Sequence, residues 1–366
     1  MNESKLSEKS SYRAVLAEPA AETGALLRLW ADNLNMSADP SAALDWQYVD
    51  GPMAPGQMFL LRAPMPDGQA VGCAGITTRE LWSDRRPVRA AHLANFAIDR
   101  EHRTALPALT LQRAVIQHVE ATFDAGLGFA NRSAFPIYLR VGYHALGPMV
   151  RYVRVLRHGD YFSRYLEEHF DNVSPRLTRH AGTAVDLGRL AIAYARAVAP
   201  MIECSLTWLA EVDARFDRLW ETHQATFGIA SRRDAAFLRW RFLRKPEAQY
   251  RIAALVDRVS EQLRAYAVVR AEPCGMAEIA DAFGNLAALD GLFARLVPEL
   301  FHRGHTAIGF RFIGDPRIRA LLAVHGFKPR EVVRLAVVHA SASCHIAPGT
   351  FCDPDAWYLT ELDADT

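Results

Sequence analysis

The chain has 366 residues, which is enough for two domains of ordinary size, each with its own hydrophobic core. Lys and Arg number 42 against 41 Asp and Glu, a balance that gives no basis for nucleic acid or an anionic membrane as the main partner. The five cysteines are scattered and never spaced as Cys-x-x-Cys, which argues against a disulfide framework or a zinc site.

The N-terminal ten residues are polar and do not resemble a signal peptide. The most apolar stretch, residues 187–209, contains charged residues and a proline that interrupt it as a membrane span. Together with the unpaired cysteines, these features predict a cytoplasmic protein in a reducing compartment.

Apolar spacing predicts a helix over 21–33, a short aromatic element at 45–49, and strands at 58–62, 70–78 and 88–98. In the third strand, side chains are expected to alternate regularly through Asn95 to Ile98. Both alternating sets are mostly apolar, which is typical of a central strand buried on both sides.

A helix is predicted over 106–123, ended by the segment 126–128 with its two glycines. A short strand or loop with Asn131 and a helix with Tyr138 follow. The alternating run 149–156 is expected to close this unit as an edge-type strand.

Residues 158–200 are rich in helix formers, and we expect a domain boundary within them. Beyond this stretch the same order of elements is predicted again. These elements are a helix at 212–224, strands at 249–256, 263–271 and 276–283, a helix at 286–301, a strand at 305–312, a helix at 317–325 and a strand at 332–338.

Two groups of residues repeat at a fixed offset of 184 to 185 residues. Phe96 in Ala-Asn-Phe-Ala-Ile-Asp corresponds to Asp281 in Ile-Ala-Asp-Ala-Phe-Gly, and Gly142 corresponds to Gly326. A period of this length indicates a duplicated domain rather than a solenoid. The predicted division is 1–158, a helical connector at 159–200, and 201–366.

These patterns resemble the GNAT superfamily of acyl-CoA-dependent N-acyltransferases. The resemblance rests on the strand and turn from Phe96 to Arg103 and on Tyr138-Leu-Arg-Val-Gly-Tyr143, and it covers nearly the whole chain as two copies. It implies an α/β (α+β) fold with two tandem GNAT-like domains, each a mixed, mostly antiparallel sheet flanked by helices.

The resemblance also implies an acyl-CoA site in the first copy, with acetyl-CoA or another acyl-CoA as substrate. In such a site the backbone N–H groups of a turn at a helix N-terminus bind the pyrophosphate. The implied binding residues are Ile98, Arg103, Thr104, Leu106, Ala108 and Asn131. Leu106 departs from the family motif, because it stands where the first glycine belongs and a side chain there opposes close approach of the phosphates.

The resemblance makes Tyr138 the candidate acid that protonates the leaving thiolate, and the ordinary pKa values of thiol and phenol suit this transfer. The alternative is that Tyr138 packs on the sheet as a helix residue. An amine nucleophile also needs a base, and His92, Asn95 and Glu80 are the best-placed polar groups. A hydrogen-bonded core histidine is the competing interpretation of His92, and Asn131 is equally typical of a turn.

The second copy lacks the residues that the resemblance assigns to the reaction. Leu322 stands where Tyr138 does, and the turn 284–291 has no Arg or Lys. The basic and aromatic segment 237–250 allows either an anion-binding element or a solvated amphipathic helix face. Its fainter counterpart in the first copy is the segment 46–48. Cys344, His345, Cys352 and Asp353 have no common zinc spacing, so no metal is expected.

The function these features favour is transfer of an acyl group, acetyl first among the candidates, from coenzyme A to an amine of a small molecule by direct attack in a ternary complex. Nucleic acid and membrane are not expected as partners, and a homodimer is compatible with the sequence. Two alternatives stay open. One is a catalytically inactive GNAT-like protein for ligand binding or assembly, and the other is a transferase that uses acyl carrier protein.

Overall fold

A computed structural model describes residues 11–34, 39–64, 68–158, 188, 203–247 and 249–364. The predicted connector 159–200 lies outside these residues apart from residue 188, so the domain bounds around it remain predictions. Below, the first half denotes residues 11–158 and the second half residues 203–364. In the described residues no helix combines the length and the apolar character needed to cross a membrane.

The first half contains a run of strands interrupted by helices. Its strands are β1 (Arg13–Ala17), β2 (Gln57–Arg62), β3 (Ala70–Ser83), β4 (Arg86–Ile98), β5 (Ala125–Ala130) and β6 (His144–Val155). Its helices are α2 (Thr23–Asn33), α3 (Pro40–Leu44), α4 (Ala105–Thr122) and α5 (Phe135–Val141), with a π-helical turn η1 (Asp45–Val49) and a 3-10 turn η2 (Arg100–His102).

The second half repeats this order and adds a C-terminal segment. Its strands are β7 (Cys204–Leu209), β8 (Ile229–Ser231), β9 (Tyr250–Asp257), β10 (Leu263–Ala271), β11 (Ala277–Gly284), β12 (Ala307–Gly314), β13 (Lys328–Ala340) and β14 (Trp357–Leu359). Its helices and turns are α8 (Ala214–His223), α9 (Ala235–Leu238), η3 (Arg239–Leu243), α10 (Leu286–His302), α11 (Pro316–Val324), α12 (Pro348–Phe351), η4 (Pro354–Ala356) and η5 (Glu361–Asp363).

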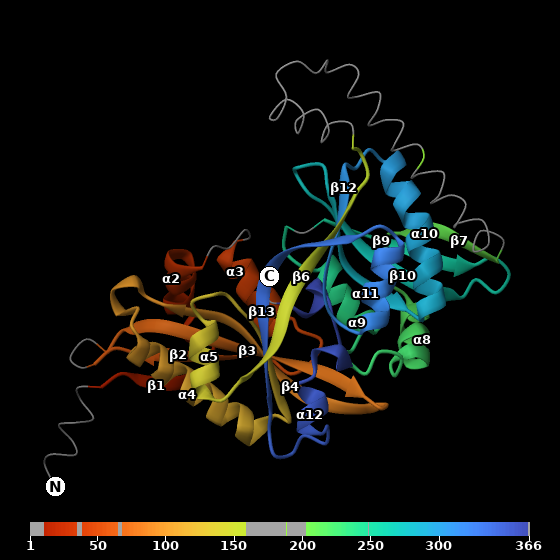
Figure 1. Ribbon diagram of the computed structural model, residues 1–366. Coiled ribbons are helices and arrows are strands. Elements are labelled where there is room, and N and C mark those ends of the chain that lie inside the picture. The colour runs from red at the N-terminus through yellow and green to blue at the C-terminus, as the bar shows by residue number, and fades with distance from the viewer. Residues whose placement is uncertain are drawn as a thin grey trace, which may run out of the picture.

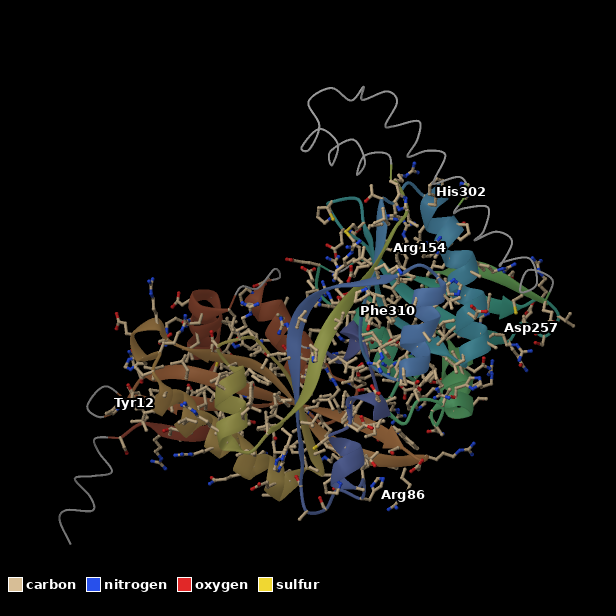
Figure 2. All side chains as sticks on the ribbon, in the orientation of Figure 1. Tyr12, Arg86, Arg154, Asp257, His302 and Phe310 are labelled. Carbon is tan, nitrogen blue, oxygen red and sulfur yellow. The ribbon has the colours of Figure 1, made fainter. Side chains whose placement is uncertain are left out.

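The described strands form one continuous sheet, and the last strands of the two halves have exchanged places. Along its main path the order is β1-β2-β3-β4-β5-β13-β6-β12-β11-β10-β9-β7. β13 pairs with β5 of the first half, while β6 pairs with β12 of the second half. Figure 1 shows β6 and β13 running side by side between the halves. In Figure 2, Arg154 of β6 lies in the same part of the molecule as Phe310 of β12, which belongs to the second half.

The exchange corrects the prediction for residues 149–156. They belong to β6, which has β13 on one side and β12 on the other, so the strand is central and not an edge. Periodicity reports which faces of a strand are buried, but it does not report how many neighbours the strand has. The exchange therefore could not be seen in the spacing.

Both central strands contain a β-bulge at the same position of the repeat. In β4, two residues, Asn95 and Phe96, lie between the pairs Ala94↔Gly75 and Ala97↔Cys73, opposite a single residue of β3. In β11 the register with β10 shifts at Ala280, 185 residues after Asn95. The bulge offset equals the offset of the sequence repeat.

The bulge also corrects the predicted alternation of the third strand. Before it, Ala91 and Leu93 face the cluster formed with α4 and α5. Beyond it, Ile98 belongs to that cluster and Ala97 faces the other side, with α2. An inserted residue shifts the two-residue period by one, so regular alternation ends at Asn95.

Helices cover both faces of the first-half sheet. Leu111 and Val115 of α4, together with Tyr138 of α5, pack on one face. Leu29 and Trp30 of α2 pack on the opposite face. Farther along this second face, the C-terminal segment contributes residues that pack beside β4 and β5.

The glycines predicted to end the 106–123 helix lie instead inside strand β5. A Cβ at Gly126 would come 3.0 Å from the Tyr143 ring, and one at Gly128 would come 3.1 Å from Leu93. Glycine here permits close packing of β5 against its neighbours rather than a turn. The helix ends earlier, at Thr122.

Candidate functional site

The candidate site is the end of β4, where this strand separates from β5. The two strands pair in parallel only from Ala90↔Ala125 to Leu93↔Gly128. β4 then continues through its bulge to Ile98, while the pairing with β5 has stopped. The result is an interruption in the middle of the sheet, with strand backbone along it.

Arg103 holds the turn that leads from β4 to α4. Its Nε donates to the carbonyl of Ile98 at 3.1 Å, and its Nη2 donates to Oδ1 of Asn33 at 2.9 Å. Asn33 in turn donates to Asp99 at 2.8 Å, and Asp99 forms an ion pair with Arg28 at 3.0 Å. The end of α2 thus fixes the turn, a role that the local sequence 98–108 does not reveal.

α4 begins directly after this turn. Thr104 occupies the N-cap position but makes no capping bond with its side chain. Pro107 and Ala108 are buried, whereas the Leu106 side chain is 63% exposed. The N–H groups in the first turn of a helix have no intrahelical partner and carry partial positive charge. Leu106 therefore lies at the rim of a potential anion site and is directed toward solvent.

Tyr138 lies beside the bulged end of β4. It is 5% exposed on α5, and its ring meets that of Phe96 edge-on, with 6.0 Å between the ring centres. Tyr143 packs against it in the same manner at 5.4 Å. Tyr138 therefore packs on the sheet, as the alternative interpretation expected, and it lies next to the separated strand, so its role as an acid stays a prediction.

Asn131 stabilises the turn that precedes α5. Its Oδ1 accepts from the backbone N–H groups of Ser133 at 3.0 Å and Ala134 at 2.9 Å. This arrangement is the turn role that competed with ligand binding in the sequence.

His92 lies on the opposite face of the sheet from Tyr138. It pairs in register with Thr77, whose hydroxyl is 3.4 Å from Nδ1, and it is fully buried. Burial, with the nearby guanidinium groups of Arg79 and Arg241, holds the pKa of His92 well below its usual value. The imidazole is therefore neutral at pH 7, but it is not brought together with Tyr138.

Glu80 lies away from the candidate site. Its partner across β3 and β4 is Arg89, six residues before Asn95, which corresponds to about 20 Å along the strand. Its carboxylate accepts from Trp82 Nε1 at 2.6 Å and pairs with Arg232 of the second half at 3.3 Å. Glu80 therefore links the two halves instead of joining Tyr138.

The corresponding interruption in the second half is filled by the chain's own C-terminal segment. β11 and β12 pair only from Ala277↔Ile308 to Ile279↔Phe310, and β14 then pairs with the end of β12. The Tyr358 hydroxyl donates to the carbonyl of Ala282. No residue from 358 to 363 is more than 1% exposed.

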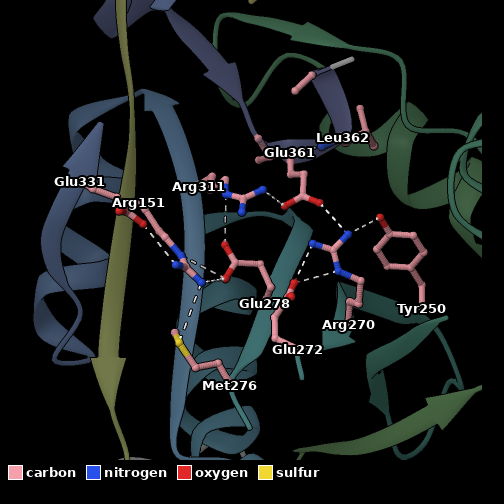
Figure 3. Close-up of polar contacts among 12 residues, drawn as sticks. Arg151, Tyr250, Arg270, Glu272, Met276, Glu278, Arg311, Glu331, Glu361 and Leu362 are labelled. Carbon is pink, nitrogen blue, oxygen red and sulfur yellow. Dashed lines mark hydrogen bonds and ion pairs between the residues drawn. The ribbon is translucent and has the colours of Figure 1, made fainter. Parts of the chain in front are cut away.

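Ion pairs between buried glutamates and partly exposed arginines hold this segment in place, as Figure 3 shows. Glu361 pairs with Arg311 at 2.6 Å and with Arg270 at 3.2 Å. Arg311 also lies 3.4 Å from Glu278, whose other partner is Arg151 of β6 at 2.7 Å. The second half therefore has charged side chains and protein backbone where the first half has its candidate site.

The basic and aromatic segment 237–250 is divided between core and surface: Phe237, Leu238, Trp240, Arg241 and Phe242 are buried, whereas Arg239, Leu243 and Arg244 are exposed. Trp240 and Arg241 are at most 2% exposed. Arg241 donates to the backbone carbonyls of Glu361 and Ala364, at 3.0 and 2.8 Å. The buried face of the segment therefore holds the C-terminal residues of the described chain, whereas Arg239 and Arg244 lie on its solvated face.

Solved structures share this architecture. A conserved protein of unknown function from Enterococcus faecalis V583, termed a probable N-acyltransferase, is similar with a TM-score of 0.62 at 11% identity, over 91% of this chain and 73% of that one. The fold is that of the GCN5-related N-acetyltransferases. Two such proteins, from Anabaena variabilis and Kribbella flavida, are similar with TM-scores of 0.62 and 0.57, both at 12% identity. They match over 90% and 91% of this chain and over 73% and 72% of their own lengths.

No protein-family model and no curated protein matches the sequence. At identities of 10 to 12% the structural likeness speaks for the fold, and the activity must be argued from the site.

Sequence reasoning identified Tyr138, Arg103 and Ile98 near the separated end of β4. It missed the roles of Asn33, which accepts a hydrogen bond from Arg103, and of Tyr48, which holds the bulge residue Asn95. Tyr48 hydrogen-bonds to Asn95 at 2.6 Å. Asn95, a polar residue within an apolar strand, was the available signal for the bulge.

Proposed function

We propose that the chain is an acyl-CoA-dependent N-acyltransferase whose site lies in the first half. The observation that carries this proposal is the separated, bulged end of β4, which lies between the N-terminus of α4 and Tyr138. The shared fold of N-acetyltransferases supports the same kind of reaction.

In the proposed reaction, a neutral amine of a small molecule attacks the thioester carbonyl of acetyl-CoA within a ternary complex. The C–N bond forms, the C–S bond breaks, and the amine loses a proton to solvent. Tyr138 donates its phenolic proton to the departing thiolate and then regains a proton from solvent, so the products are an amide and free coenzyme A. Backbone N–H groups at the end of β4 would stabilise the oxyanion.

Coenzyme A would bind with its pyrophosphate at the start of α4, near Arg103, Thr104 and Leu106. The N-terminal charge of a helix favours phosphate there without specific side chains. The exposure of Leu106 supports this site despite the missing glycine, because the side chain is directed toward solvent.

Thermal unfolding with added acetyl-CoA tests the proposal. A hundredfold excess over Kd is expected to stabilise the protein by about 2.7 kcal/mol. Because the Leu106 side chain is directed toward solvent, Leu106→Gly should change binding no more than the matched change Ala105→Gly, whereas Leu106→Asp should weaken it several-fold by placing a negative charge beside the phosphates. Absence of stabilisation at millimolar acetyl-CoA, together with no thiol release across a panel of amines, would refute the proposal.

A further inference from the structure

Tyr48 reaches from the turn η1 to the bulge of β4. Its hydroxyl donates to Oδ1 of Asn95 at 2.6 Å, and the side chain is 1% exposed. Nothing in the local sequence around Tyr48 indicates that its hydroxyl contacts β4. Its position is set by a contact between residues 47 apart.

Asn95 adopts a left-handed backbone conformation, with φ of 51°. Such conformations are uncommon outside glycine, although asparagine tolerates them better than most residues. The Cys73 thiol donates to the Asn95 carbonyl at 3.4 Å. The bulge residue is therefore held through both its side chain and its backbone.

Two glycines make room for Tyr48. A Cβ at Gly75 would lie 1.8 Å from the Tyr48 hydroxyl oxygen, and one at Gly56 would lie 2.4 Å from its ring. The Gly56 N–H also donates to the Tyr48 carbonyl at 2.8 Å. The surroundings of the ring are built for a tyrosine in this position.

The second half anchors the turn that carries Tyr48. Trp46 stacks on Trp240 with 5.0 Å between ring centres. The indole N–H of each donates to the backbone carbonyl of the other, both at 2.8 Å. A chain of contacts thus runs from the second half through η1 to the end of β4.

We propose that Tyr48 is a positioning residue for acyl transfer, which holds the Asn95 bulge and so the backbone N–H groups at the end of β4. This inference rests on the proposed function. Preorganised backbone donors act mainly in the transition state, so their displacement lowers kcat more than it raises KM. The second half contributes to the site by fixing η1.

Tyr48→Phe tests the role in transfer. It is expected to lower kcat at least tenfold, with KM for the acyl-CoA within about twofold. Adding Asn95→Gly should restore kcat to within about threefold, because glycine adopts positive φ without support from a side chain. Adding Asn95→Ala should not restore it.

Tyr266→Phe is the matched control. It removes a buried tyrosine hydroxyl bonded to Asp281 at 2.7 Å, beside the bulge of the second half. It should lower stability and leave kcat unchanged. A kcat that falls equally in both variants, or a Tyr48→Phe protein with wild-type kcat, would overturn the positioning role.

A stability measurement separates this inference from the proposed function. Unfolding of Tyr48→Phe, Asn95→Gly and the double variant should give non-additive losses, with the double variant losing less than the sum of the single ones. Additive losses would refute the link between Tyr48 and the bulge even in a protein without transferase activity. Non-additive losses in a protein that releases no thiol would refute only the proposed function and with it the catalytic role.

Discussion

At the scale of single residues, Tyr138 is the proposed acid of the transfer reaction. Its ring contacts Phe96, the second residue of the β4 bulge, so any thioester along that strand end would be close to it. The hydroxyl is the only chemical difference between Tyr138 and phenylalanine. A change limited to that atom therefore isolates its contribution.

Tyr138→Phe is expected to lower kcat by about a hundredfold or more, which is typical for the loss of a general acid. KM for the acyl-CoA should change little, because the ring and its packing are retained. Steady-state thiol release measures both constants. The half-buried Tyr152 on β6 provides the control, and an equal effect of Tyr152→Phe would remove Tyr138 as the acid.

His92 makes stability depend on pH. Its folded-state pKa is well below the ordinary value near 6.5, so the unfolded chain binds a proton that the folded chain rejects. As the pH falls below about 6.5, stability should decrease by up to about 1.4 kcal/mol per pH unit. Above pH 6.5 both states are neutral at this position and the slope disappears.

Denaturant unfolding between pH 5 and 8 measures this slope. His92→Gln should flatten the decrease below pH 6.5, whereas His345→Gln at an exposed position should keep it. If the slope persists in His92→Gln, another group causes it, and protonation of the buried imidazole does not contribute.

At the scale of elements, the C-terminal segment is packed against backbone that tolerates no added atom. Gly314 at the end of β12 has φ of 136°, and a Cβ there would lie 1.8 Å from the carbonyl oxygen of Trp357. Gly349, within α12, has no such neighbour within 4 Å. The pair offers a direct test of how tightly the segment is seated.

Gly314→Ala is expected to destabilise the protein by about 2–4 kcal/mol, since strain and displacement of β14 add together. Gly349→Ala should change stability by no more than about 0.5 kcal/mol. Thermal unfolding compares the two. Equal melting temperatures would mean that β14 is loosely held.

Helices and strands were predictable from sequence where the pattern of their own buried side chains determines their position. β4, α4, β10 and α10 show the apolar spacing of strands and helices packed on a sheet, so each was located within a few residues. The short strands β1, β8 and β14 were missed, because three to five residues with a neighbour elsewhere in the chain carry little periodic signal.

The site was predictable only in part for a related reason. Arg103 and Tyr138 belong to local motifs, whereas the bond between Tyr48 and Asn95 joins segments from separate elements. Spacing also placed Glu80 among the candidates, although the strand carries it about 20 Å from the bulge. Chemistry-bearing residues can be listed from sequence, but their convergence depends on register and long-range pairing.

At the scale of the whole molecule, the exchange of β6 and β13 makes each half depend on the other. The first half alone would lack β13 beside β5, and the second half alone would lack β6 beside β12. Unpaired strand edges invite association. The halves should therefore be stable only together.

Separate expression of residues 1–158 and 203–366 tests this dependence. Each fragment alone is expected to aggregate or to associate with itself by strand exchange, and co-expression should yield a one-to-one complex. Size-exclusion chromatography with light scattering distinguishes these outcomes. A folded, monomeric 1–158 fragment would show that the exchange is dispensable.

The exchanged strands also affect how such a molecule can change over time. In a homodimer with swapped strands, every substitution occurs in both copies of the chain. Its two sites must therefore gain or lose catalytic residues together. One continuous chain has no such obligation: Tyr138 can face Phe96 in one half while Leu322 fills the same place in the other. A single chain also has only one copy of the segment 357–364, which fills the interruption between β11 and β12, so the two halves share one sheet and are still free to differ.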